Sequence, residues 1–268
     1  MYRLFAIGVV LLWLGAMSAL LVRDVWPAWT AQDPPPMTVE QFSRLHRERQ
    51  QFGMYDARGN RLGTSWSEVV TTRSITSIHG TILLEGLKLI PTVIRIETIT
   101  EFDKQGALDS FGLDIYGVPE TEIYIRGERR GIYFPCELKL GTVNLQANLN
   151  LSASRMIGQT FTPFAFLPEL KVGQSWRMQF LNPLSAVLSK RTHFISVVAR
   201  VTGTEAIEHL GKQVECFIVQ THPTQAKAWV DKNGRVLMQE ADIPMLGKVV
   251  IREENFNEQA WQAARYDY

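Results

Sequence analysis

The chain has 268 residues, and its 28 Lys and Arg side chains nearly balance its 27 Asp and Glu side chains, for a formal net charge of +1. A protein that binds nucleic acid needs a concentrated basic face to release counterions from the phosphates. The densest basic run, Arg126 to Arg130, is interrupted by a glycine and a glutamate and is typical of a solvated hairpin tip. The composition therefore argues against a nucleic-acid partner.

The first stretch, Leu4 to Val22, contains no charged residue and is almost wholly apolar. At about 1.5 Å of rise per residue, a helix of this length spans a hydrocarbon core of about 30 Å. Two alternatives stand: a cleaved secretory signal with a small-residue site at Ala16 to Ala19, or an uncleaved anchor. We favour the anchor, because cleavage there leaves an apolar new terminus and because Trp26 and Trp29 suit the headgroup layer of a membrane interface.

The charges that flank this span predict its orientation. Arg3 and the terminal amine precede it, whereas Arg23 follows it with Asp24 beside it. The positive-inside rule then places the body of the protein outside the cytoplasm. We therefore predict a single-pass anchor over residues 1–23 and an extracytoplasmic body.

Residues 24–53 are predicted to be a linker and a short helix. Pro34 to Pro36 stiffen the linker. Thr38 and Gln41 have the spacing of a capping box, and a thin apolar stripe follows at Phe42, Leu45 and Phe52. Such a helix either lies on anionic headgroups or packs across an open end of a sheet, and we favour the packing.

From Met54 onward the dominant period is two, which predicts strands. The segment Val143 to Ala153 alternates without a fault, with every second residue apolar. Its other face is polar but uncharged, which makes it either a contact surface or an ordinary solvent face. The candidate contact residues on that face are Asn144, Gln146, Asn148 and Asn150.

Turn chemistry predicts how the strands connect. Asp103 to Gly106 and Asp231 to Gly234 place Asp first and Gly last, as tight turns between antiparallel strands prefer. No long amphipathic segment separates the strands, which excludes a parallel βαβ sheet. We predict a mainly β fold over residues 54–268, a single domain in which an antiparallel meander forms a sandwich or a partial barrel. A terminal helix is expected at Asn255 to Ala264.

Four segments carry a family resemblance: Gly59 to Thr64, Leu170 to Trp176, Val201 to Glu205 and Ala228 to Leu237. The chain resembles bacterial extracytoplasmic β domains of unknown function, which occur alone or ahead of transglutaminase-like domains and are similar in outline to lipoprotein-carrier half barrels. This resemblance implies a bacterial inner-membrane protein whose β domain lies in the periplasm. It implies no catalytic residue, since the matching positions are mostly turn glycines and strand aromatics.

Chemical motifs are missing from the sequence. Cys136 and Cys216 are the only thiols, and they either form a disulfide or stay as two buried free thiols. Neither belongs to a Cys-x-x-Cys motif or has a histidine close by, so no metal or haem site is expected. No nucleophile elbow or phosphate loop occurs either. We predict no cofactor and no enzyme activity.

One loop is too apolar to lie free in water: Phe161, Phe164 and Phe166 gather between two prolines. It packs in the core of the domain, or it contacts a partner protein or a lipid.

Two hypotheses for the function stand. In the first, the chain is a non-catalytic, membrane-anchored accessory or structural subunit whose β domain docks on the subunits of a larger membrane complex, of the respiratory or photosynthetic type. In the alternative, it is a tethered half barrel that binds a lipid or another lipophilic ligand at the phenylalanine loop.

Overall fold

The computed structural model describes residues 13, 15–18, 49–72, 75–85, 92–104, 107–150, 167, 169–181, 194–243 and 246–266. Trp13 and residues 15–18 are helical, and the rest of the predicted anchor lies outside the described residues. Within the described ranges, no helix is both long and apolar enough to cross a bilayer. Other predicted site residues that lie outside these ranges are Trp26, Trp29, Phe161, Phe164 and Phe166.

The described residues of the body form one sheet of fourteen strands, followed by helix α5. All neighbouring strands are antiparallel, in the order β8-β7-β6-β5-β4-β3-β2-β1-β14-β13-β12-β11-β10-β9. The bounds are β1 Arg49–Asp56, β2 Arg61–Thr71, β3 Ile75–Leu84, β4 Ile94–Asp103, β5 Leu108–Tyr116, β6 Ile123–Glu128, β7 Tyr133–Leu140, β8 Val143–Asn150, β9 Ser175–Leu181, β10 Phe194–His209, β11 Lys212–His222, β12 Lys227–Val230, β13 Val236–Ile243, β14 Gly247–Glu254 and α5 Glu258–Tyr266.

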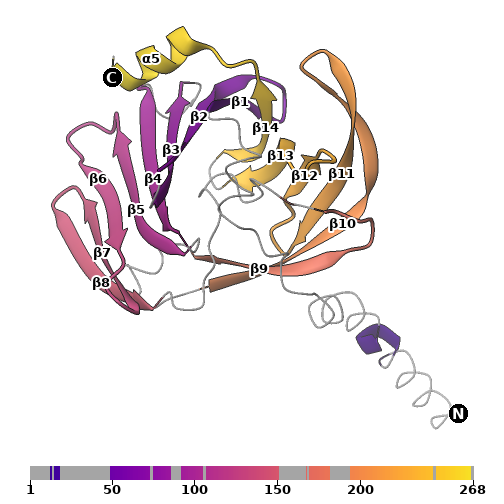
Figure 1. Cartoon of the computed structure of the whole chain (residues 1–268), viewed down its shortest axis with the longest axis horizontal. Coiled ribbons are helices and arrows are strands. Elements are labelled where there is room, and N and C mark those ends of the chain that lie inside the picture. The colour runs from indigo at the N-terminus through magenta and orange to yellow at the C-terminus, as the bar shows by residue number, and fades with distance from the viewer. Residues whose placement is uncertain are drawn as a thin grey trace, which may run out of the picture.

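The strand order shows how the two halves of the chain meet. Strands β1 to β8 form one meander and β9 to β14 form another, and the first and last strands join them through the pair of β1 with β14. The sheet curls into an incomplete barrel (Figure 1). The predicted antiparallel meander is confirmed, and of the two predicted architectures the single curved sheet is the partial barrel. The meander is nevertheless interrupted, because in the described sheet β8 and β9 are the two edge strands and do not pair with each other.

The start of the sheet corrects one prediction. Arg49 and Phe52, which the sequence assigned to a helix, belong to β1. This strand pairs with β2 on one side and with β14 on the other, and Phe52 packs into the core. A strand paired on both sides satisfies its backbone groups and buries alternate side chains, and this outweighs a local helix signal.

One face of the sheet, called the inner face below, carries most of the apolar core. Residues that pair directly across antiparallel strands share a face. A continuous inner row therefore crosses the middle of the sheet, and it consists of Gly63, Met54, Ile251, Gln239, Ala228, Val219 and Val201. Two buried clusters extend it along β1 to β8, and a third covers β9 to β13.

The opposite, outer face is covered in part by α5, which confirms the predicted terminal helix. Trp261 and Ala264 of the helix pack with Trp66 and Leu83 of the sheet. Asn257 Oδ1 accepts a hydrogen bond from the backbone N–H of Ala260 and so caps the helix.

The predicted turn from Asp231 to Gly234 is confirmed, whereas Gly106 of the other predicted turn lies outside the described residues. Between β12 and β13, the N–H of Gly234 donates to the carbonyl of Asp231 at 2.9 Å, and Gly234 has a φ of 87°. That left-handed conformation favours glycine. Asp231 Oδ1 accepts from two further backbone N–H groups of the turn. At the β4 to β5 turn, Asp103 Oδ1 accepts from the N–H of Ala107.

Candidate functional site

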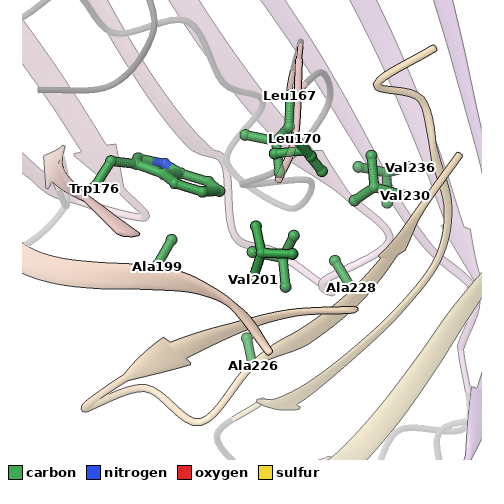
Figure 2. Packing of buried hydrophobic residues seen from close by; sticks show 10 residues of the cluster. Leu167, Leu170, Trp176, Ala199, Val201, Ala226, Ala228, Val230 and Val236 are labelled. Carbon is green, nitrogen blue, oxygen red and sulfur yellow. The ribbon is translucent and has the colours of Figure 1, made fainter. Parts of the chain in front are cut away.

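The inner face of β9 to β13 is a floor of small and medium apolar side chains. Ala199, Val201, Val219, Ala228 and Val230 are fully buried there. Figure 2 shows this floor with Leu167 and Leu170 packed over it. Leu167 is held in place by its N–H, which donates to the carbonyl of Gly234 at 2.8 Å. Leu167 and Leu170 thus form a roof over part of the floor.

Trp176 of β9 places a polar group in these apolar surroundings. Its side chain is 1% exposed and pairs across the sheet with Ala199. Its indole ring extends toward Val201 (Figure 2). Indole Nε1–H is a hydrogen-bond donor only, and no acceptor meets it among the described residues. A buried donor without a partner costs about 1–3 kcal/mol.

Gln239 of β13 is a second polar residue on the same face. It lies in the inner row between Ala228 and Ile251 and is 4% exposed. Its side-chain amide carries two donor hydrogens and an acceptor oxygen, so it adds hydrogen-bonding groups to an otherwise apolar row.

Neither residue was a site candidate in the sequence. The alternation of apolar Trp176, Met178 and Phe180 with polar Arg177 and Gln179 predicts that Trp176 lies on the buried side of a strand, as an ordinary core residue. Gln239 follows a β-bulge between β12 and β13 that shifts the register by one residue, so simple alternation does not assign its face. The only sequence signal for Gln239 is an uncharged polar residue within an apolar strand.

The predicted polar face of β8 lies on the outer side of the sheet. Asn144, Gln146 and Asn148 are exposed, whereas Leu149 of the alternate set is fully buried. Asn144 Nδ2 donates to Glu137 Oε1 of β7 at 3.0 Å. Asn150 ends the strand, and its side chain lies outside the described part. Because β8 is an edge strand of the described sheet, this face adjoins an edge.

The two cysteines are free, buried thiols. Of the two alternatives for them, a disulfide or two buried free thiols, the structure has the second. They belong to separate core clusters, Cys136 with Phe134 and Leu138, and Cys216 with Trp229 and Leu237. Burial raises the pKa of each thiol to about 11. Both therefore stay protonated at neutral pH, which makes them poor nucleophiles and poor metal ligands.

A cleft of about 240 Å³ lies between α5 and the outer face of β2 to β5. Its walls include Trp66, Glu68, His79, Glu97, Asp114 and Trp261. Two of its carboxylates are already paired, because Arg49 Nε lies 2.9 Å from Glu68 and Arg126 Nη2 lies 2.8 Å from Asp114. No group of three or more His, Cys, Asp or Glu side chains in the described ranges is arranged to hold a metal ion.

Comparison with known proteins gives a likeness in structure and no match in sequence. No protein-family model matches the chain, and no curated protein matches its sequence. Among solved structures, it is similar to the beta-barrel-like protein of domain of unknown function DUF1849 from Brucella abortus. The sequences are 10% identical, the match covers 78% of this chain and 98% of the other, and the TM-score is 0.43.

Proposed function

We propose that the partial barrel is a non-catalytic binding module that holds a lipophilic molecule against the inner face of β9 to β13. The observation that carries this proposal is the unpartnered buried indole N–H of Trp176, on an otherwise apolar face. An apolar surface with a few convergent polar groups is the usual composition of a small-molecule site. Leu167 and Leu170 are the roof of the proposed site.

The apolar segment Leu4 to Val22 is the proposed tether of this module. Its length and lack of charge suit a membrane span, and Trp26 and Trp29 suit the interface beyond it. A tethered module receives its ligand from the membrane or passes it on there. The proposed location is the bacterial inner membrane, with the β domain in the periplasm. Membrane fractionation with protease treatment of intact cells tests this, and protection of the β domain inside the cell contradicts it.

Lipid content and dye binding test the binding function. We expect the full chain, purified in mild detergent, to release lipid into organic solvent and to bind N-phenyl-1-naphthylamine with a rise in fluorescence. Ala228→Leu enlarges a fully buried floor residue and should lower dye affinity about 10-fold, since the added atoms occupy the proposed site. The matched control, Ala206→Leu, alters an exposed alanine of β10 and should leave affinity unchanged. A wild-type chain without lipid and without dye binding refutes the proposal.

The exposed amides of Asn144, Gln146 and Asn148 favour a second candidate, an accessory subunit that docks on a larger membrane complex of the respiratory or photosynthetic type. Such a neutral polar face beside a sheet edge suits hydrogen bonding with a partner protein. Co-purification in mild detergent tests it. Asn148→Arg should release a stoichiometric partner, whereas Gln220→Arg, at an exposed position of β11, should not. Purification of the wild-type chain without any membrane subunit contradicts this candidate.

A further inference from the structure

We propose that the cleft between α5 and the outer face of β2 to β5 binds a small organic amine in its ammonium form, with the charged group at Glu97 and Asp114 and the apolar part toward α5. This site is separate from the inner face, and the inference does not depend on the binding function proposed there. It follows from the space in the cleft, from the order of its side chains and from the balance of its charges.

The cleft is open space beside side chains that solvent reaches. Its volume is about 240 Å³. The partly exposed residues of its walls are Glu68, His79, Thr81, Glu97, Ile99 and Asp114. A ligand therefore meets these side chains without displacing a packed core. Pockets for drug-sized ligands measure roughly 300–1,000 Å³, so this cleft suits a smaller molecule.

The floor of the cleft runs from an aromatic end to an acidic end. Residues that pair directly across antiparallel strands share a face, and one row across β2 to β5 consists of Trp66, Thr81, Glu97 and Asp114. At the aromatic end, Trp261 of α5 packs with Trp66. The row covers three strand spacings, which is about 14 Å at about 4.8 Å per spacing. This order suits a ligand with an apolar body at one end and a polar group at the other.

The charges at the acidic end select a cation. Glu97 and Asp114 pair directly across β4 and β5, and like charges in this relation repel each other. Arg126 Nη2 neutralises Asp114 at 2.8 Å. Among the described residues, the ion-pair partner of Glu97 is Arg95 Nε at 3.6 Å, which is too long for a hydrogen bond. The carboxylate of Glu97, which is 36% exposed, therefore keeps its acceptor oxygens for a ligand.

The rest of the lining argues against an anionic ligand. Among the described residues that line the cleft, three carboxylates face one guanidinium, that of Arg265. This guanidinium lies 3.8 Å from Glu68 and stacks over the ring of Trp261. An anion is repelled by the excess of carboxylates. A primary ammonium is instead a compact cation with three donor hydrogens, and it can bond both carboxylates of the acidic end.

Two probes that differ in charge test the inference. 2-Phenylethylamine is an ammonium ion at neutral pH, and 2-phenylethanol is its neutral counterpart. Each is titrated calorimetrically into the full chain in mild detergent, with detergent alone as the blank. We expect the amine to bind at least about 5-fold more tightly than the alcohol at low salt, and this difference to shrink as salt is added.

Variants locate the binding site of the amine. Glu97→Gln should weaken the amine about 5-fold and leave the alcohol within about 2-fold. Glu128→Gln is the matched control, since this side chain of β6 is 70% exposed outside the cleft and should change neither affinity. Thr81→Phe places a ring in the middle of the row and should weaken both probes at least about 10-fold.

Three results overturn the inference. The first is a wild-type chain that binds no amine, or binds the amine and the alcohol equally. The second is an unchanged amine affinity in Glu97→Gln or in folded Thr81→Phe, because the amine then lies elsewhere. Should Thr81→Phe not fold, the imidazole NMR signal of His79 decides, since His79 lines the cleft. This signal, identified by its loss in His79→Gln, must shift when the amine is added to the wild-type chain, and an unshifted signal is the third result.

Discussion

Arg95 of β4 donates from Nη1 to the backbone carbonyl of Ala264 at 3.3 Å and so caps the last turn of α5 from the outer face of the sheet. The same group lies 3.4 Å from the carbonyl of Arg265, and the guanidinium stacks over Tyr116. Alternation predicts Arg95 on the polar side of β4, which is correct. Its 9% exposure is not visible in the sequence, because the helix that covers it lies some 170 positions further along the chain.

Arg95→Ala should destabilise the protein by about 2 kcal/mol, because it removes charge-assisted hydrogen bonds to carbonyls that otherwise lack partners at the helix end. Urea unfolding measures the change. Arg130→Ala is the control, since that side chain is 75% exposed and should change stability by no more than about 0.5 kcal/mol. If Arg95→Ala and Arg130→Ala unfold at the same urea concentration, Arg95 does not stabilise the end of α5.

Gln51 links the sheet to the start of α5. Its Oε1 accepts from Trp66 Nε1 and from the N–H of Asn257, both at 2.9 Å. Gln51→Leu should cost about 2 kcal/mol, because it leaves the buried indole N–H of Trp66 without an acceptor. Limited proteolysis should then cleave near Asn257 before it cleaves the sheet. Gln146→Leu, at an exposed position, is the control and should leave the cleavage pattern as in the wild type.

Gly127 of β6 has no room for a methyl group. A Cβ at this position lies 2.5 Å from the Phe111 ring and 2.9 Å from Cys136 Sγ. Gly127→Ala should destabilise the fold by about 1–3 kcal/mol through overpacking, measured as the thermal midpoint. Adding Phe111→Leu should restore part of the loss. Gly203→Ala is the control, because nothing lies within 4 Å of its Cβ position. If Gly127→Ala and Gly203→Ala unfold at the same thermal midpoint, overpacking at Gly127 is excluded.

The thiols give a prediction for pH. Burial raises the pKa of Cys136 and Cys216 from 9.0 to about 11, so folding favours the protonated thiol. This stability is fully present below pH 9 and is lost as the pH rises through 11. We expect both thiols to react with an aromatic disulfide reagent at pH 8 only after unfolding in denaturant. Fast labelling of the native protein at this pH contradicts their burial.

Local signals determined a large part of this protein from sequence alone. The alternation along 143–149, the Asp231 to Gly234 turn and the terminal helix were predictable because each depends on residues close together in the chain. The common face of Cys136 with Phe134 and Leu138 was predictable for the same reason, since the two-residue period of a strand assigns faces.

Only the tertiary structure decided what depends on distant segments. Arg49 and Phe52 resemble the end of a helix until β1 pairs with β2 and with β14, which lies some 200 positions later. Contacts between distant segments also decide three other features. These are the break between β8 and β9, the separation of the two cysteines and the burial of Arg95 under α5. Trp176 became a site residue for a related reason: the sequence predicts that its indole is buried, but only packing in three dimensions shows that its N–H meets no acceptor among the described residues.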